Sequence, residues 1–150
     1  NISTERASTS RVQAVNFARE ALAAVRALRD SNWVAGRDPW TGIVSGNDYV
    51  LAFTEATGVY TLQEGQDFAL VRAPSSVYTQ GSSALGDATQ FSRWIDVQDV
   101  NCSALPAADQ GDCDALGLPR IGARVTAHIR WFNQGHTQEI AFSEDLYDWR

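Results

Sequence analysis

The spacing of hydrophobic residues changes along this chain, from a helical period near its start to a two-residue period beyond residue 47. Over residues 8–30, apolar side chains recur at steps of three and four without Gly or Pro between them, so we predict one amphipathic helix. Arg19 and Arg26 fall on the polar side of this helix. The apolar stripe expected to face a sheet comprises Phe17, Ala21, Leu22, Val25 and Leu28.

Beyond the helix, short runs rich in Val, Leu, Phe and Tyr are separated by Gly-containing turns, which is typical of antiparallel strands. The Ser- and Gly-rich residues 74–87 are expected to form an exposed excursion. We therefore predict an α+β fold, with an N-terminal amphipathic helix packed on an antiparallel β-sheet. Strands are expected over residues 48–54, 59–63, 67–73 and 89–100, followed by a hairpin over 124–142.

Length and composition limit this chain to one domain over residues 1–150, since 150 residues with 44% hydrophobic content supply a single core. The net charge of −6 repels phosphate and so disfavours general nucleic-acid binding. All 12 basic residues are arginine, which excludes Schiff-base and P-loop lysine chemistry. No run approaches the ~18 apolar residues of a membrane span, so we expect any such segment to precede Asn1.

The two cysteines, Cys102 and Cys113, enclose a polar segment that contains one Pro and one Gly. Loop residues between two cysteines favour a disulfide formed in an oxidising compartment. In the chain-entropy treatment, closing a loop of this size stabilises the fold by ~3 kcal/mol. The alternative is a pair of free thiols in a cytosolic protein.

The sequence offers little catalytic chemistry. His128 is expected on a solvated strand face and His136 follows the Gly of a turn, so neither is assigned a catalytic role. The carboxylates Asp109, Asp112 and Asp114 could gather a Ca²⁺ ion, but their spacing is not that of an EF-hand, and a solvated acidic loop is favoured. We expect no cofactor and no enzymatic activity.

Five tryptophans are many for a chain of this length. Trp33, Trp94 and Trp131 lie in or beside patterned segments and are assigned to the core. Trp40 and Trp149 have no such context, and an exposed Trp often marks a contact surface. These two are therefore candidate contact residues, the alternative being that both fold back onto the sheet edge.

Three segments, taken in their order and spacing, resemble bacterial type IV pilins and pilin-like proteins. Residues 18–33 (AREALAAVRALRDSNW) are similar to the back half of the long N-terminal pilin helix. Residues 91–97 (FSRWIDV) resemble a central strand, and residues 124–149 resemble the closing hairpin with its Leu-Tyr-Asp-Trp tail. Together these segments cover about half of the chain.

The resemblance implies a structural subunit of a type IV pilus, a major or minor pilin that supports adhesion, surface motility or DNA uptake. Residues 1–33 would be the C-terminal half of the pilin helix, with the loop and sheet in residues 34–150. An apolar segment before Asn1 would anchor the subunit in the inner membrane before assembly and be its only membrane contact. The implied partners are other pilin subunits in an extracellular helical filament and the pilus assembly machinery. The family's usual disulfide lies near the C-terminal end, whereas Cys102 and Cys113 precede the final hairpin.

Other functions compete with this one. A type II secretion pseudopilin would share the fold and form a short periplasmic filament. A ligand-binding adhesin domain would use Trp40, Trp149 or residues 74–87 to grip a sugar or a protein. An enzyme such as a glycosidase is the most distant alternative, because nothing singles out a catalytic pair among the 18 acidic residues.

Overall fold

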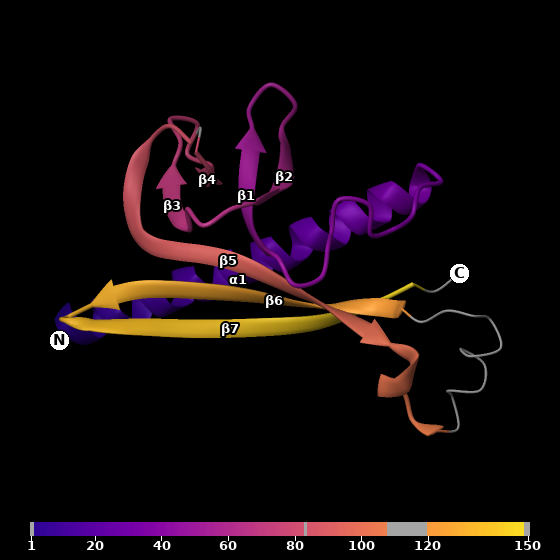
Figure 1. The fold of residues 1–150 in the computed structure, drawn as a ribbon. Coiled ribbons are helices and arrows are strands. Elements are labelled where there is room, and N and C mark those ends of the chain that lie inside the picture. Colours follow the sequence, from indigo (N-terminus) through magenta and orange to yellow (C-terminus); the bar gives the residue numbers. More distant parts are fainter. Residues whose placement is uncertain (1, 83, 108–119, 149–150) are drawn as a thin grey trace.

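A computed structural model describes residues 2–82, 84–107 and 120–148 (Figure 1). A long N-terminal helix packs on an antiparallel sheet, so the predicted α+β arrangement is confirmed. The elements are α1 (Ile2–Val34), β1 (Asp48–Thr54), β2 (Val59–Glu64), β3 (Ala69–Arg72), β4 (Tyr78–Thr79), β5 (Asp87–Asn101), the short 3₁₀ helix η1 (Cys102–Ala104), β6 (Arg120–Asn133) and β7 (His136–Tyr147).

Strand β5 organises the sheet because it is long enough to pair with three other strands. Along one edge it pairs with β6, which in turn pairs with β7. Along its other edge it pairs with β3 and then with β1, and these two strands carry β4 and β2. In Figure 1, β1 to β4 rise above the long β5–β7 strands as a separate lobe. We call residues 48–86 the β1–β4 lobe.

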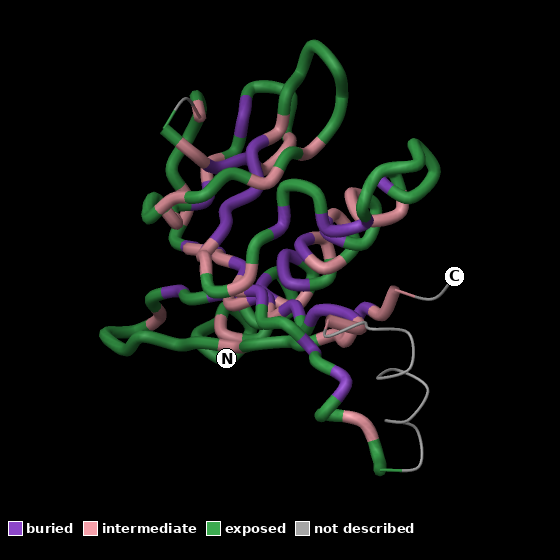
Figure 2. The backbone as a smooth tube through the Cα atoms, turned by 45° about the vertical axis from the view of Figure 1, so that its right-hand side comes forward, coloured by how far each residue is buried: buried purple, intermediate pink, exposed green. Residues whose placement is uncertain are grey.

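The core lies between α1 and the face of the sheet that carries alternate apolar residues. Figure 2 shows buried stretches where helix and strands meet and exposed loops at the rim. On α1, Phe17, Ala21 and Val25 are buried, whereas Leu22 and Leu28 are half-buried and pack against the core. On β6 the buried residues share the parity predicted from the sequence: Val125, Ala127, Ile129 and Trp131.

Strand β7 runs alongside α1 in the same direction. Gln134 Nε2 donates a hydrogen bond to the Ser3 carbonyl at 3.5 Å, and Arg26 Nη2 lies 2.6 Å from Glu144 Oε2. Between these contacts the helix advances about 35 Å at 1.5 Å per residue. The strand advances about 33 Å at 3.3 Å per residue. The two elements therefore stay in step, and the middle of β7 lies beside the middle of α1.

The helix and the closing hairpin are longer than predicted, and one predicted loop contains a strand. Helix α1 begins at Ile2, six residues before the predicted start.

Within the described residues, no helix is both long and apolar enough to cross a membrane. The predicted exposed excursion at 74–87 contains strand β4, and Thr79 and Gln80 are buried. The prediction failed because polar side chains can be buried where they satisfy backbone hydrogen bonds, as the Gln80 amide does.

Candidate functional site

Trp40, predicted as a contact residue, is buried, with 7% of its surface exposed. The loop after α1 folds back because buried Asn32 donates its side-chain amide to the carbonyls of Pro39 and Thr41 at 3.1 and 2.9 Å. The Arg120 guanidinium covers the indole, with Cζ 4.8 Å from the ring centroid. The contact-surface prediction for Trp40 is therefore wrong, because these hydrogen bonds hold the loop against the core.

The remaining tryptophans divide between core and surface. Trp131 is buried as predicted, and Trp94 is half-buried on the face of the sheet opposite α1. Trp33 is 43% exposed, so its assignment to the core is wrong. It follows Asn32 on the helix, and Asn32 occupies the inward position, so Trp33 is rotated away from the core.

Several predicted site residues lie outside the described residues: Cys113, Trp149, Asp109, Asp112 and Asp114. Cys102 is described and is 5% exposed. Its disulfide with Cys113 stays a prediction, as does the candidate Ca²⁺ loop. Among the residues that are described, no group of three or more His, Cys, Asp and Glu side chains is arranged to hold a metal ion.

Arg93 is a fully buried charge on the helix side of β5. Its Nη1 lies 2.7 Å from Glu20 Oε1 of α1, and its Nε donates to Gln80 Oε1 at 2.9 Å. Its Nη2 has no hydrogen-bond partner in the part of the chain that the structure describes. Because a buried charge is costly without compensation, this ion pair ties the helix to the sheet at one position.

Gln80 extends this network toward the lobe. Its amide nitrogen donates to the carbonyls of Phe68 and Arg93 at 2.9 and 2.7 Å. Beside it, the Tyr60 hydroxyl donates to a carbonyl of β4 at 3.0 Å. Burial, with a smaller contribution from the Glu20 carboxylate, raises the pKa of Tyr60 to about 12. The polar groups between helix and lobe are therefore structural, each engaged in holding two elements together.

The opposite face of the sheet carries a second cluster, centred on His128. Its imidazole stacks on the Trp94 indole, with ring centroids 4.8 Å apart and planes 2° apart. Its Nε2 lies 2.6 Å from Asp96 Oδ2, and its Nδ1 lies 3.6 Å from Glu139 Oε1. Arg130 covers the same indole at 4.9 Å and pairs with Glu139 at 3.0 Å. We call these five residues the His128 cluster.

The His128 cluster is closed rather than poised for chemistry. His128 is half-buried, so its prediction as a solvated residue is wrong, because β5 and β7 each place a carboxylate beside it. Nε2 meets Asp96, and Nδ1 is buried without a hydrogen-bond partner among the described residues, so neither nitrogen is open to a substrate. The cluster can fix the register of three strands by cross-strand pairing.

The outward side of α1 differs from the two clusters because two of its charges, unlike Arg26, have no carboxylate partner among the described residues. Arg11 and Arg19 are exposed, and neither forms an ion pair with any residue that the structure describes. Val12 lies between them and is 57% exposed. The match between helix and strand places Phe142 of β7, 39% exposed, at the level of Ala21 and Leu22, less than one helical turn beyond Arg19. We call Arg11, Val12, Arg19 and Phe142 the arginine face.

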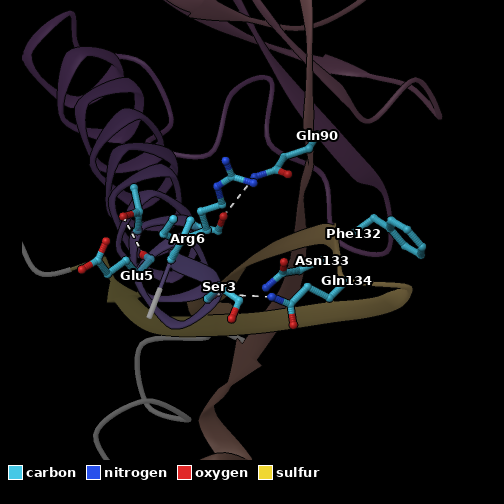
Figure 3. A pocket seen from close by; sticks show the side chains of 10 residues that line it. Ser3, Glu5, Arg6, Gln90, Phe132, Asn133 and Gln134 are labelled. Atoms are coloured by element: carbon cyan, nitrogen blue, oxygen red, sulfur yellow. Dashed lines mark hydrogen bonds between the residues drawn. The ribbon is translucent and has the colours of Figure 1, made fainter.

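A cleft of about 960 Å³ separates the first turns of α1 from the β6–β7 turn (Figure 3). Gln134 reaches the Ser3 carbonyl across it, and Gln90 Nε2 donates to Ser10 Oγ at 3.1 Å. Phe132, 61% exposed, lies at its wall, and the charged lining is one Glu and one Arg of α1. Its mixed, open lining brings no pair of titratable groups together for acid–base catalysis among the described residues.

Sequence reasoning missed both charged clusters. The parity of Arg93 with the buried Phe91, Ile95 and Val97 was a usable signal that Arg93 points inward. No comparable signal pointed to the His128 cluster, since Trp94 and His128 become neighbours only through the β5–β6 register.

No protein-family model matches the chain, and no curated protein or solved structure matches it significantly.

Proposed function

We propose that this protein is a structural subunit, a major or minor pilin, of an extracellular type IV pilus. The proposal rests on the division of α1 into two faces. One face is buried against the sheet by Phe17, Ala21 and Val25, and the other leaves the arginine face exposed. The pilin resemblance implies such a helix, which packs on the sheet with one side and contacts neighbouring subunits with the other.

The order of the elements supports the same proposal. A long helix, a connecting loop, a short-stranded lobe and a closing hairpin follow one another along the chain. Identical subunits that meet through two different surfaces form an open helical filament when the contact does not close into a ring. The filament would carry the heads as its outer coat, with the assembly machinery and other subunits as partners.

Electron microscopy of sheared surface filaments, labelled with an antibody against residues 1–150, tests the proposal. We expect labelled filaments in the parent strain and none after deletion of the gene. Sparse labels in the parent strain, on filaments that still form without label after the deletion, would identify a minor pilin. A strain without labelled filaments, in which deletion instead abolishes protein secretion, would overturn the pilus and identify a pseudopilin.

A matched pair of variants links assembly to the helix. Val12→Asp places a charge on the exposed side of α1, whereas Val44→Asp places one on a 54% exposed residue of the loop between α1 and β1. Both substitutions lie on the surface, so each should change the free energy of unfolding by less than about 0.5 kcal/mol. We expect Val12→Asp to reduce the number of filaments and Val44→Asp to leave it unchanged.

A further inference from the structure

We infer that the arginine face of α1 binds the acidic β1–β4 lobe of a second copy of this chain. The inference rests on the proposed function, because it names the surfaces through which successive heads would meet. Its experiments report on the contact itself, separately from whether the protein is found in pili.

The two surfaces carry opposite, uncompensated charge. Arg11 and Arg19 contribute two cations without an acidic partner among the described residues. The lobe carries one arginine and four carboxylates, a net charge of −3, and none of these forms an ion pair within the described residues. The four carboxylates are Asp48, Glu55, Glu64 and Asp67. By contrast, Arg130 and Glu139 of the His128 cluster already pair with each other and offer little to a partner.

Each surface also offers an apolar side chain next to its charges. Val12 lies between Arg11 and Arg19 and is 57% exposed. At the tip of the β1–β2 hairpin, Val59 is 55% exposed and lies close in sequence to Glu55. A contact of Val12 with Val59 would bury apolar surface while the carboxylate approaches the guanidinium groups.

These complementary surfaces do not pair within one molecule, because no ion pair among the described residues joins Arg11 or Arg19 to a carboxylate of the lobe. Figure 1 shows the tip of the β1–β2 hairpin at the outer end of the lobe, projecting away from the long strands, whereas the rest of β2 lies beside α1. The contact must therefore form between copies, and because it joins two different patches it is heterologous. A heterologous contact repeats from subunit to subunit, which is the geometry a filament needs.

The contact is expected to be weak between isolated heads. The net charge of −6 repels two copies at long range, whereas at physiological salt the local charges act only within ~8 Å. In a filament, other contacts between the subunits would hold neighbouring heads close together. The effective concentration of the two patches would then be high, so a weak contact between them can form fully.

Nuclear magnetic resonance of residues 1–150, recorded from about 0.05 to 1 mM, tests the contact at the affinity expected for it. We expect concentration-dependent shifts at the arginine face and at the tip of the β1–β2 hairpin, which disappear in about 0.5 M salt. No shifts, shifts confined to one patch, or shifts elsewhere would overturn the inference. Shifts at the arginine face produced only by an added polyanion would overturn the second copy as the partner.

A charge exchange identifies the paired residues. Arg19→Glu alone and Glu55→Arg alone should each weaken self-association about tenfold, a change of 1.4 kcal/mol. An equimolar mixture of the two variants should restore association, because each then presents the charge that the other needs. Arg6→Glu, which makes the same charge change on another side of α1, should have little effect. Failure of the mixture to recover, or an equal loss with Arg6→Glu, would contradict the pairing.

The same variants in cells separate the two proposals. If the native chain is absent from surface filaments, the proposed function fails whatever the resonance shifts show. If the native chain is present but the Arg19→Glu, Glu55→Arg double variant assembles no better than either single variant, only the inference fails.

Discussion

Two charged residues of β5, Arg93 and Asp96, point to opposite faces of the sheet, one buried under α1 and the other at the surface. Arg93 points toward α1, where it is fully buried and depends on Glu20 for compensation. Asp96 points to the other face, where it meets His128 at the surface of the sheet. The alternation of a strand thus decides which charge is energetically costly to disturb.

Replacing Glu20 with Gln should destabilise the fold by about 1–3 kcal/mol, because the buried Arg93 guanidinium loses its counter-charge. The expected loss is lower than for a fully buried pair, since the Glu20 side chain is 35% exposed and solvent screens the interaction. Urea unfolding measures the change. As a control, Glu5→Gln alters an exposed helix carboxylate and should change stability by less than about 0.5 kcal/mol. Equal effects of the two substitutions would show that the ion pair does not stabilise the helix–sheet interface.

Tyr60 should make the fold sensitive to alkali. Its pKa is raised from 10.0 to about 12 in the folded state, so the folded chain keeps the phenol proton that the unfolded chain loses. The unfolded state then binds fewer protons between pH 10 and 12, and the free energy of unfolding falls as pH rises through this window. Denaturant unfolding at a series of pH values should show a smaller fall for Tyr60→Phe. An unchanged pH profile in that variant would contradict the assignment.

At the scale of the elements, α1 is a surface helix fixed by one stripe. Its stability depends on packing of that stripe rather than on helix propensity alone. Phe17 anchors the stripe, with its ring 4.8 Å from Tyr78 and 5.2 Å from Phe91, both in edge-on geometry. Arg26, on the exposed side, donates from Nη2 to both carboxylate oxygens of Glu144, and solvent screens this ion pair.

Phe17→Ala should therefore cost about 3–5 kcal/mol, because it removes a buried ring and leaves a cavity between helix and sheet. Leu22→Ala should cost less, since Leu22 is half-buried. Arg26→Ala should cost under about 1 kcal/mol, as expected for an exposed ion pair. Chemical unfolding of the three variants checks this order. An equal loss of stability for Arg26→Ala and Phe17→Ala would contradict this prediction, because it would mean that the exposed side of α1 stabilises the fold as much as the buried stripe.

At the scale of the whole molecule, charge is distributed unevenly. The helix carries a cationic side, the lobe is acidic, and the hairpin face is neutralised by cross-strand pairs such as Arg124 with Asp145. The Arg124 guanidinium holds the pKa of Asp145 below its usual value. A net charge of −6 alone would suggest uniform repulsion between copies, whereas the distribution allows one orientation of approach.

A disulfide between Cys102 and Cys113 would join the end of β5 to the segment before β6. We expect protein exported to the periplasm to show no free thiol when it is titrated in denaturant without reductant. The Cys102→Ser, Cys113→Ser double variant should lose roughly 3 kcal/mol of stability, as loop closure predicts. Two titratable thiols in the native protein would contradict the bond.

The sequence by itself determined the class of fold. The change from a helical to a two-residue period predicted one helix followed by antiparallel strands, and the alternation along β6 predicted which of its residues are buried. These features depend on local backbone geometry, so they can be read from spacing alone.

Tertiary structure decided which polar and aromatic residues lie inside. Trp40 is buried because Asn32 folds the following loop back, and Arg93 is tolerated inside because Glu20 meets it from another element. Trp94 and His128 become stacked neighbours only once β5 and β6 pair in one register. Each of these outcomes depends on residues far apart in the chain, whose partners local spacing does not specify, because burial of a polar group is decided by the partner that satisfies it.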